Sequence, residues 1–102
     1  MPPSFDLIIA PSALRELNSF KSFMRRQIRD AIDQQLPFEP DKATRNRKML
    51  SAEQADFDFT PPLWELRVGD HRIFYDIDLD AHTVYVRAIR IKPPHSTTDE
   101  VL

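Results

Sequence analysis

The stretch WELRVGDHRIFYDID, residues 64–78, contains the single glycine of a 102-residue chain. On each side of Gly69-Asp70 lies a run of alternating apolar and polar residues that is rich in β-branched and aromatic types, which is typical of strands. Glycine at the first of two central positions favours a two-residue hairpin loop, because it adopts positive φ without steric cost. The sequence therefore predicts a β-hairpin in which Val68 lies opposite His71.

The two faces of this hairpin differ in chemistry, because side chains alternate across a sheet. One face carries the apolar residues Trp64, Leu66, Val68, Ile73, Tyr75 and Ile77. The other carries Glu65, Arg67, Arg72, Phe74 and Asp76. A slip of one residue would mix the two sets, so their separation supports this register. In it Arg67 lies directly opposite Arg72, an arrangement of like charges that destabilises a sheet.

A third strand is predicted at residues 83–92, TVYVRAIRIK, after a turn near Asp80-Ala81. Continued alternation pairs Ile77 with Val84, Tyr75 with Val86 and Ile73 with Ala88. Tyr85, Arg87 and Ile89 then join the charged face, where Arg87 is a diagonal neighbour of Arg72. His71 falls on the apolar face beside Arg90, where we expect a structural role.

The first part of the chain predicts one strand and two helices. Residues 5–10, FDLIIA, form a short apolar run that ends at Pro11, and Ser12 and Ser19 are candidate N-cap residues. Apolar residues then recur every three or four positions over residues 20–36, which predicts an amphipathic helix that ends before Pro37.

The connection at residues 37–62 holds four prolines and no glycine. A structureless connection of this length is uncommon, so we expect a short strand or turn at residues 47–51. The connection also contains the basic run KATRNRK, residues 42–48. A solvated loop is one interpretation of this run, and contact of Arg45, Arg47 and Lys48 with nucleic-acid phosphates is the other.

Together these segments predict an α+β fold: two N-terminal helices packed on one face of a small, mainly antiparallel four-stranded sheet. With 41% hydrophobic and 29% charged residues, we expect one globular domain over residues 1–102 and a flexible tail at residues 93–102. There is no cysteine and no apolar run near the roughly 20 residues of a membrane-spanning helix. We therefore expect a cytoplasmic protein without disulfides and without a membrane partner.

The charged face of the sheet admits more than one interpretation. Its arginines either extend into water, neutralised by Glu65 and Asp76, or bind an anion such as phosphate. Phe74 and Tyr85 beside them suggest stacking on bases of single-stranded RNA, although an acidic protein segment fits the same geometry. The net charge of −2 argues against a general nucleic-acid binder but leaves room for a local basic face. The three histidines lack ligand spacing, so we expect no metal and no cofactor.

One strand, two helices and a three-stranded meander, with LWELRVGDHRIFYDID in its hairpin and VRAIRIK in its last strand, resemble the RelE/ParE toxin superfamily of bacterial type II toxin–antitoxin systems. The likeness covers about residues 5–92. It implies a small α+β toxin that a cognate antitoxin wraps and neutralises. RelE-like members enter the ribosomal A site and cut mRNA, whereas ParE-like members poison DNA gyrase.

The resemblance also implies roles for individual residues. RelE-like nucleases work without a metal: the ribose 2′-hydroxyl attacks, and basic side chains orient it and stabilise the phosphate. Arg67 and Arg72 match the sheet arginines of those enzymes. Elsewhere the chain departs from them, because Leu63 and Glu65 stand where RelE has two lysines and the tail has no tyrosine. The nearest substitutes are Lys92 as the basic residue past the last strand, Glu65 as a base and His95 as an acid.

The leading hypothesis from the sequence is a ribosome-dependent mRNA endoribonuclease that inhibits translation. Its catalytic residues are Arg67, Arg72, Glu65 and His95, and its RNA-binding residues are Arg87, Lys92, Arg90, Arg45, Arg47 and Lys48. The alternative is a non-enzymatic toxin that binds gyrase, or an attenuated toxin that mainly binds its antitoxin. The missing lysines and the sequence pI of 5.9 favour this alternative. Both hypotheses predict a toxin–antitoxin hetero-oligomer.

Overall fold

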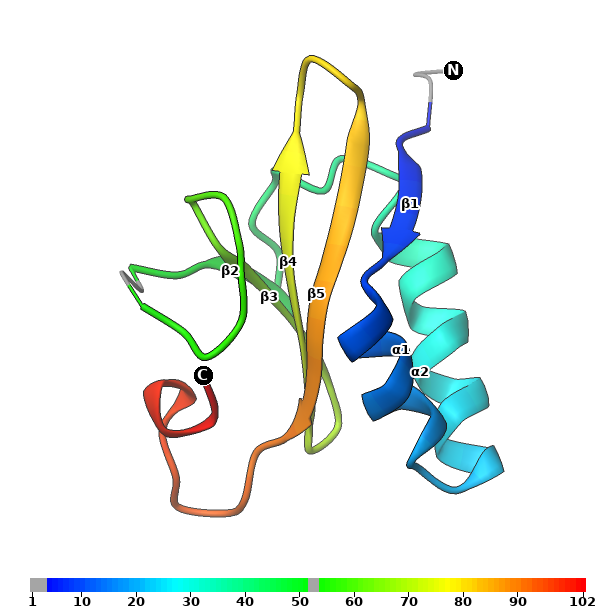
Figure 1. Ribbon diagram of the computed structural model, residues 1–102, viewed down its shortest axis with the longest axis vertical. Helices are drawn as coiled ribbons and strands as arrows, with labels where there is room; N and C mark the ends of the chain where they lie inside the picture. The colour runs from blue at the N-terminus through cyan, green and yellow to red at the C-terminus, as the bar shows by residue number, and fades with distance from the viewer. Residues whose placement is uncertain (1–3, 52–53) are drawn as a thin grey trace.

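The computed structural model describes residues 4–51 and 54–102. The elements follow the chain as β1 (Asp6–Ile9), α1 (Pro11–Asn18), α2 (Ser22–Gln35), β2 (Arg47–Met49), β3 (Trp64–Val68), β4 (His71–Asp78), β5 (Thr83–Ile91) and the 3-10 turn η1 (Thr98–Val101). The strands form one sheet in the order β1-β5-β4-β3-β2, with β1 parallel to β5 and the other neighbours antiparallel. Both helices lie on the same face of this sheet (Figure 1). The predicted α+β class is confirmed. The sheet has five strands rather than the predicted four, and the additional strand is β2, which forms where the sequence predicts a short strand or turn.

The helices begin at other residues than the predicted caps. Helix α1 begins at Pro11, whose fixed φ suits the first helical position, and no side chain caps it. Helix α2 begins at Ser22 after an extended Lys21, so Ser12 and Ser19 are not N-caps. Instead Ser19 closes the end of α1, since its hydroxyl donates to the Glu16 carbonyl at 2.6 Å. As far as the described residues extend, neither helix has the length and apolar character needed to cross a membrane.

A hydrophobic core fills the space between the helices and the sheet. Its buried members are Ala13, Leu17, Ile28, Ile32 and Leu36 from the helical segments and Trp64, Leu66, Ile73, Tyr75, Val84, Val86 and Ile89 from the sheet. The predicted apolar face of the hairpin is therefore the face that the helices cover. Tyr75 is fully buried there, and its hydroxyl donates to the Pro40 carbonyl at 2.9 Å. Burial raises the pKa of Tyr75.

The predicted register of β3 against β4 is confirmed, with Val68 opposite His71 and Arg67 opposite Arg72. Gly69 has φ +59°, the left-handed conformation expected for this loop.

The register of β4 against β5 is right only for its first part. Ile77 lies opposite Val84 and Tyr75 opposite Val86, as predicted, but a bulge follows and leaves Arg87 as the extra residue. Ile73 then lies opposite Ile89 rather than Ala88, Arg72 lies opposite Arg90, and His71 lies opposite Ile91. The bulge moves Ile89 into the helix-facing core and Ala88 to the other face, so a strictly alternating pattern could not have predicted it.

A second, smaller core covers part of the other face of the sheet. Leu63, Phe74 and Ala88 are buried there beneath Leu50, Phe57, Phe59, Val101 and Leu102. The tail reaches this cluster by turning back after β5 (Figure 1), and Arg90 Nη1 donates to the Val101 carbonyl at 2.9 Å. Phe74 has no exposed surface, so the prediction that it stacks on RNA bases is wrong. Flexibility of the tail stays a prediction.

Candidate functional site

A hollow of about 240 Å³ lies beside the β3–β4 turn and the loop before β2. We call it the basic hollow. Its lining residues are Thr44, Arg45, Asn46, Arg47, Lys48, Glu65, Arg67, Arg72, Lys92 and Thr98. Six of these residues are basic and one is acidic. The hollow thus gathers seven of the ten predicted site residues.

The two opposed arginines differ in how firmly they are held. Arg72 Nη1 donates to the carbonyls of Gly69 at 2.8 Å and His71 at 2.9 Å, and its Nε lies 3.4 Å from Glu65 Oε1. Its side chain is only 12% exposed. Arg67 is exposed and forms no ion pair with any part of the chain that the structure describes. Arg72 is therefore a fixed cation, while the guanidinium of Arg67 is available to a ligand.

Among the side chains that the structure describes, Glu65 is the only carboxylate in the lining of the basic hollow, and it is 4% exposed. Its Oε1 accepts a hydrogen bond from Thr98 Oγ1 at 3.0 Å and faces Arg72, while its Oε2 lies 3.6 Å from Lys48 Nζ. Burying a carboxylate is costly unless it is paired and hydrogen-bonded. These contacts stabilise the charge of Glu65 and fix the position of its carboxylate.

Arg47 lines the basic hollow, but its guanidinium donates hydrogen bonds to carbonyls at and just after the end of α2. It is 8% exposed, and its Nη1 donates to the carbonyls of Gln35 and Phe38 at 3.0 Å each. The guanidinium thus ties β2 to the C-terminal end of α2. Nη1 of Arg47 is thus taken up by internal hydrogen bonds, and its Nε is buried without a hydrogen-bond partner among the described residues, so little of this guanidinium is left to contact RNA. Arg45 and Lys48, from the same basic run, are exposed at the hollow.

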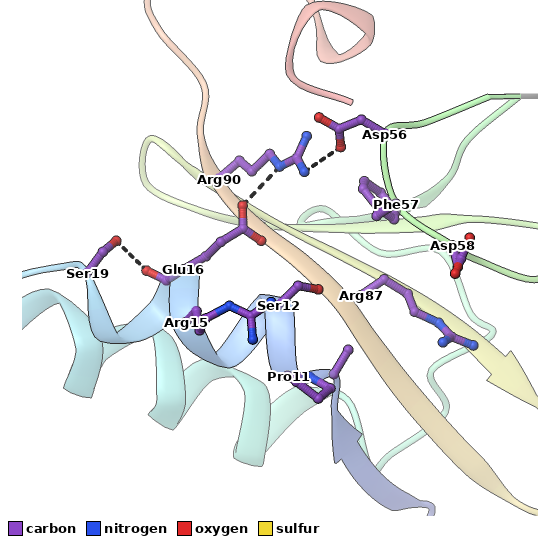
Figure 2. A pocket seen from close by; sticks show the side chains of 11 residues that line it. Pro11, Ser12, Arg15, Glu16, Ser19, Asp56, Phe57, Asp58, Arg87 and Arg90 are labelled. Atoms are coloured by element: carbon purple, nitrogen blue, oxygen red, sulfur yellow. Dashed lines mark hydrogen bonds and ion pairs between the residues drawn. The ribbon is translucent and has the colours of Figure 1, made fainter.

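Arg87 and Arg90 lie in a different place, a groove of about 800 Å³ between α1 and residues 56–58 (Figure 2). Arg87 Nε donates to Asp76 Oδ2 at 2.8 Å, and Arg90 binds both Glu16, at 3.1 Å, and Asp56. Burial opposes the charge of Arg90, but its hydrogen bonds with Asp56 and Glu16 outweigh burial and raise the pKa of its guanidinium. Neither arginine lines the hollow, although the sequence predicts Arg87 as a diagonal neighbour of Arg72 and both as RNA-binding residues, because acidic partners hold both side chains elsewhere.

The histidines do not gather at one site. His71 is buried, and burial lowers its pKa despite the opposing charge of Asp70. His82 stacks on Phe5 with 3.7 Å between ring centroids. His95 is exposed in the tail and is not part of the hollow's lining, although Lys92 and Thr98 on either side of it are. Within the described residues, no group of three or more histidine and acidic side chains is arranged to bind a metal.

The family is settled by comparison with known proteins. Residues 7–92 match the family model described as the ParE toxin of the type II toxin–antitoxin system parDE. The chain belongs to this toxin family. A search of curated protein sequences gave no match.

Several solved structures share the fold of this toxin. The RelBE2 toxin–antitoxin complex of Mycobacterium tuberculosis is 21% identical with a TM-score of 0.69, and the match covers 87% of this chain and 99% of that one. The RelE–RelB complex of Pyrococcus horikoshii OT3 is 17% identical with a TM-score of 0.68, over 89% and 98% of the two chains. The isolated E. coli RelE toxin is 16% identical with a TM-score of 0.68, over 95% and 94%. At these identities the likeness shows the fold alone.

Three residues of the hollow, Thr98, Thr44 and Asn46, were not predicted from the sequence. Thr98 lies in the tail, where no periodicity predicts structure, and beyond the residues that match the family model. Thr44 and Asn46 lie within the basic run, where they are the uncharged polar residues between the arginines and lysines. No local pattern marks these three residues, because the hollow forms only when the loop, the hairpin and the tail meet.

Proposed function

We propose that this toxin is a ribosome-dependent mRNA endoribonuclease whose basic hollow holds the scissile phosphate. The observation that carries the proposal is the meeting of an available Arg67, a fixed Arg72 and a buried Glu65 in one hollow. Guanidinium groups bind phosphate oxygens through paired hydrogen bonds and stabilise the charge that develops in the transition state. Arg45, Lys48 and Lys92 add positive charge around the same space.

The proposed reaction is an in-line displacement within the RNA strand. Glu65 accepts the proton of the ribose 2′-hydroxyl as the 2′-oxygen forms a bond to phosphorus. The bond from phosphorus to the 5′-oxygen breaks, and the leaving oxygen takes a proton from His95 or from water. The products are a 2′,3′-cyclic phosphate and a 5′-hydroxyl end, so atoms and charges balance. Glu65 is better placed as the base than His95, because it lines the hollow.

We further propose that a cognate antitoxin binds and neutralises this chain in a hetero-oligomer in the cytoplasm, with residues 1–102 acting as one domain. Two of the structures that share its fold are complexes of a toxin with its antitoxin. We expect an antitoxin whether this toxin cuts mRNA or binds gyrase.

The alternative is a non-enzymatic toxin that binds DNA gyrase, or an attenuated toxin that mainly binds its antitoxin. The match to the ParE family model favours it, as do the contacts that hold Arg72 against Glu65. A primer-extension assay on mRNA undergoing translation distinguishes the two. Cleavage within codons supports the nuclease, whereas intact mRNA together with a supercoiling defect supports gyrase binding.

Arg67→Ala tests the residue on which the nuclease proposal depends most directly. We expect it to abolish mRNA cleavage and growth arrest, because the available guanidinium is lost, while thermal stability stays unchanged since Arg67 is exposed. Arg26→Ala, at an exposed arginine of α2, is the matched control and should cleave like wild type. Full cleavage by Arg67→Ala would show that the hollow is not the active site.

A further inference from the structure

Thr98 provides the only contact from the tail to a carboxylate of the basic hollow among the described residues. Its Oγ1 donates to Glu65 Oε1 at 3.0 Å, although the two residues are 33 positions apart in the chain. Thr98 is partly buried and opens η1. It lies outside the segment that matches the family model, so family membership assigns it no role.

The two oxygens of the Glu65 carboxylate have different surroundings. Oε1 is held from two sides, by the Thr98 hydroxyl and by Arg72 Nε at 3.4 Å. Within the described part of the chain, the charged partner of Oε2 is Lys48 Nζ at 3.6 Å, and the Lys48 side chain is 64% exposed. A carboxylate held through one oxygen presents the other in a defined direction, which a general base requires.

The far end of η1 keeps Thr98 in this place. The carbonyl of Val101 accepts a hydrogen bond from Arg90 Nη1 at 2.9 Å, and Val101 packs against the buried cluster that contains Phe74. Arg90 is in turn held by Glu16 and Asp56. The turn that carries Thr98 therefore has an anchor of its own, independent of Glu65.

We propose that Thr98 is a positioning residue for the reaction: its hydroxyl fixes Oε1 of Glu65 and so directs Oε2 toward the ribose 2′-hydroxyl. This inference rests on the proposed nuclease function. Thr98 takes no part in bond making or breaking; the proton moves from the 2′-hydroxyl to Glu65, as in the reaction above. Its contribution lies in the orientation of the base rather than in the binding of RNA.

Two substitutions and one matched control test this role in a translation reaction with a reporter mRNA. Single-turnover cleavage is measured over a range of toxin concentrations, which gives a maximal rate and a half-saturating concentration. Thr98→Val keeps the shape of the side chain but removes the donor, and should lower the maximal rate about tenfold with the half-saturating concentration unchanged. Thr98→Ser keeps the donor and should restore the rate, and Thr97→Val, at the exposed neighbouring threonine, should match wild type.

The possible results separate this inference from the proposed function. Equal maximal rates for wild type and Thr98→Val, or a rise in the half-saturating concentration alone, overturn the positioning role and leave the nuclease intact. A loss that Thr98→Ser fails to restore also overturns it, because the hydroxyl is then not the cause. If wild type itself leaves the mRNA intact, the proposed function fails and this inference fails with it.

Discussion

Arg67 and Arg72 are the same residue type at directly opposed positions of one hairpin, yet their environments differ. Arg72 is held by two carbonyls of the turn and by Glu65, whereas Arg67 is exposed. The direct opposition of like charges is tolerated because Glu65 offsets one of them from the same face of the sheet. At the scale of single residues, the hollow therefore combines one structural cation with one that is available to a ligand.

His71 makes the stability of the protein depend on pH. It is 6% exposed, its ring packs edge-on against Phe20 with 4.8 Å between centroids, and its Nδ1 has no hydrogen-bond partner among the described residues. Burial lowers its pKa below the ordinary value of 6.5. Between the lowered pKa and 6.5 the unfolded chain binds more protons than the folded one, so stability falls as pH falls through this range.

Urea unfolding of wild type and His71→Gln at pH 7.5, 6.5 and 5.5 measures this effect. We expect wild type to lose more stability than the variant on acidification, since the two proteins differ only at residue 71. Equal losses of unfolding free energy in the two proteins would mean that His71 does not cause the pH dependence of stability.

At the scale of elements, the sheet is completed by contacts that join distant segments. Strand β2 has three residues and pairs only with β3, so backbone hydrogen bonds give it little support. Arg47 at its start bonds to the last helical residue of α2 and to Phe38. This bridge joins the edge strand to the helical layer and so holds in place the loop with Arg45 and the strand with Lys48, both of which line the hollow.

Replacing Arg47 by methionine should destabilise the fold by about 2 kcal/mol, the cost of lost hydrogen bonds from a charged donor to partly buried acceptors. Methionine keeps much of the side-chain volume, so the loss reports the donors rather than a cavity. Denaturant unfolding gives the value, and Arg45→Met, at an exposed neighbour, should stay within about 0.5 kcal/mol of wild type. Equal midpoints for the two variants would contradict the bridging role.

Across the whole molecule, charge is separated rather than uniform. The basic hollow lies beside the β3–β4 turn, while Asp76, Asp78 and Asp80 line a depression near the β4–β5 turn. The net charge of −2 therefore conceals a local concentration of positive charge. A nucleic acid bound at the hollow meets the positive part of the surface and is repelled from the acidic turn.

Binding of single-stranded RNA should weaken as salt rises, with a slope of log K against log salt of about −0.7 for each phosphate contact. Fluorescence anisotropy with a labelled oligonucleotide between 50 and 200 mM KCl, roughly the range in which counterion release dominates, measures it. Lys48→Gln should reduce the slope by about 0.7, whereas Lys21→Gln, at an exposed lysine before α2, should leave it unchanged. Equal reductions of the slope by Lys48→Gln and Lys21→Gln would mean that RNA does not bind specifically at the hollow.

The sequence by itself determined the hairpin, the opposition of Arg67 and Arg72, and the apolar face that the helices cover. These features follow from alternation and from one glycine, which act between neighbours in the chain. Only the tertiary structure decided the bulge at Arg87, the internal bonds of Arg47 and the bond between Thr98 and Glu65. Each depends on burial and hydrogen-bond partners supplied by segments far away in the chain. A local sequence pattern therefore cannot predict these features.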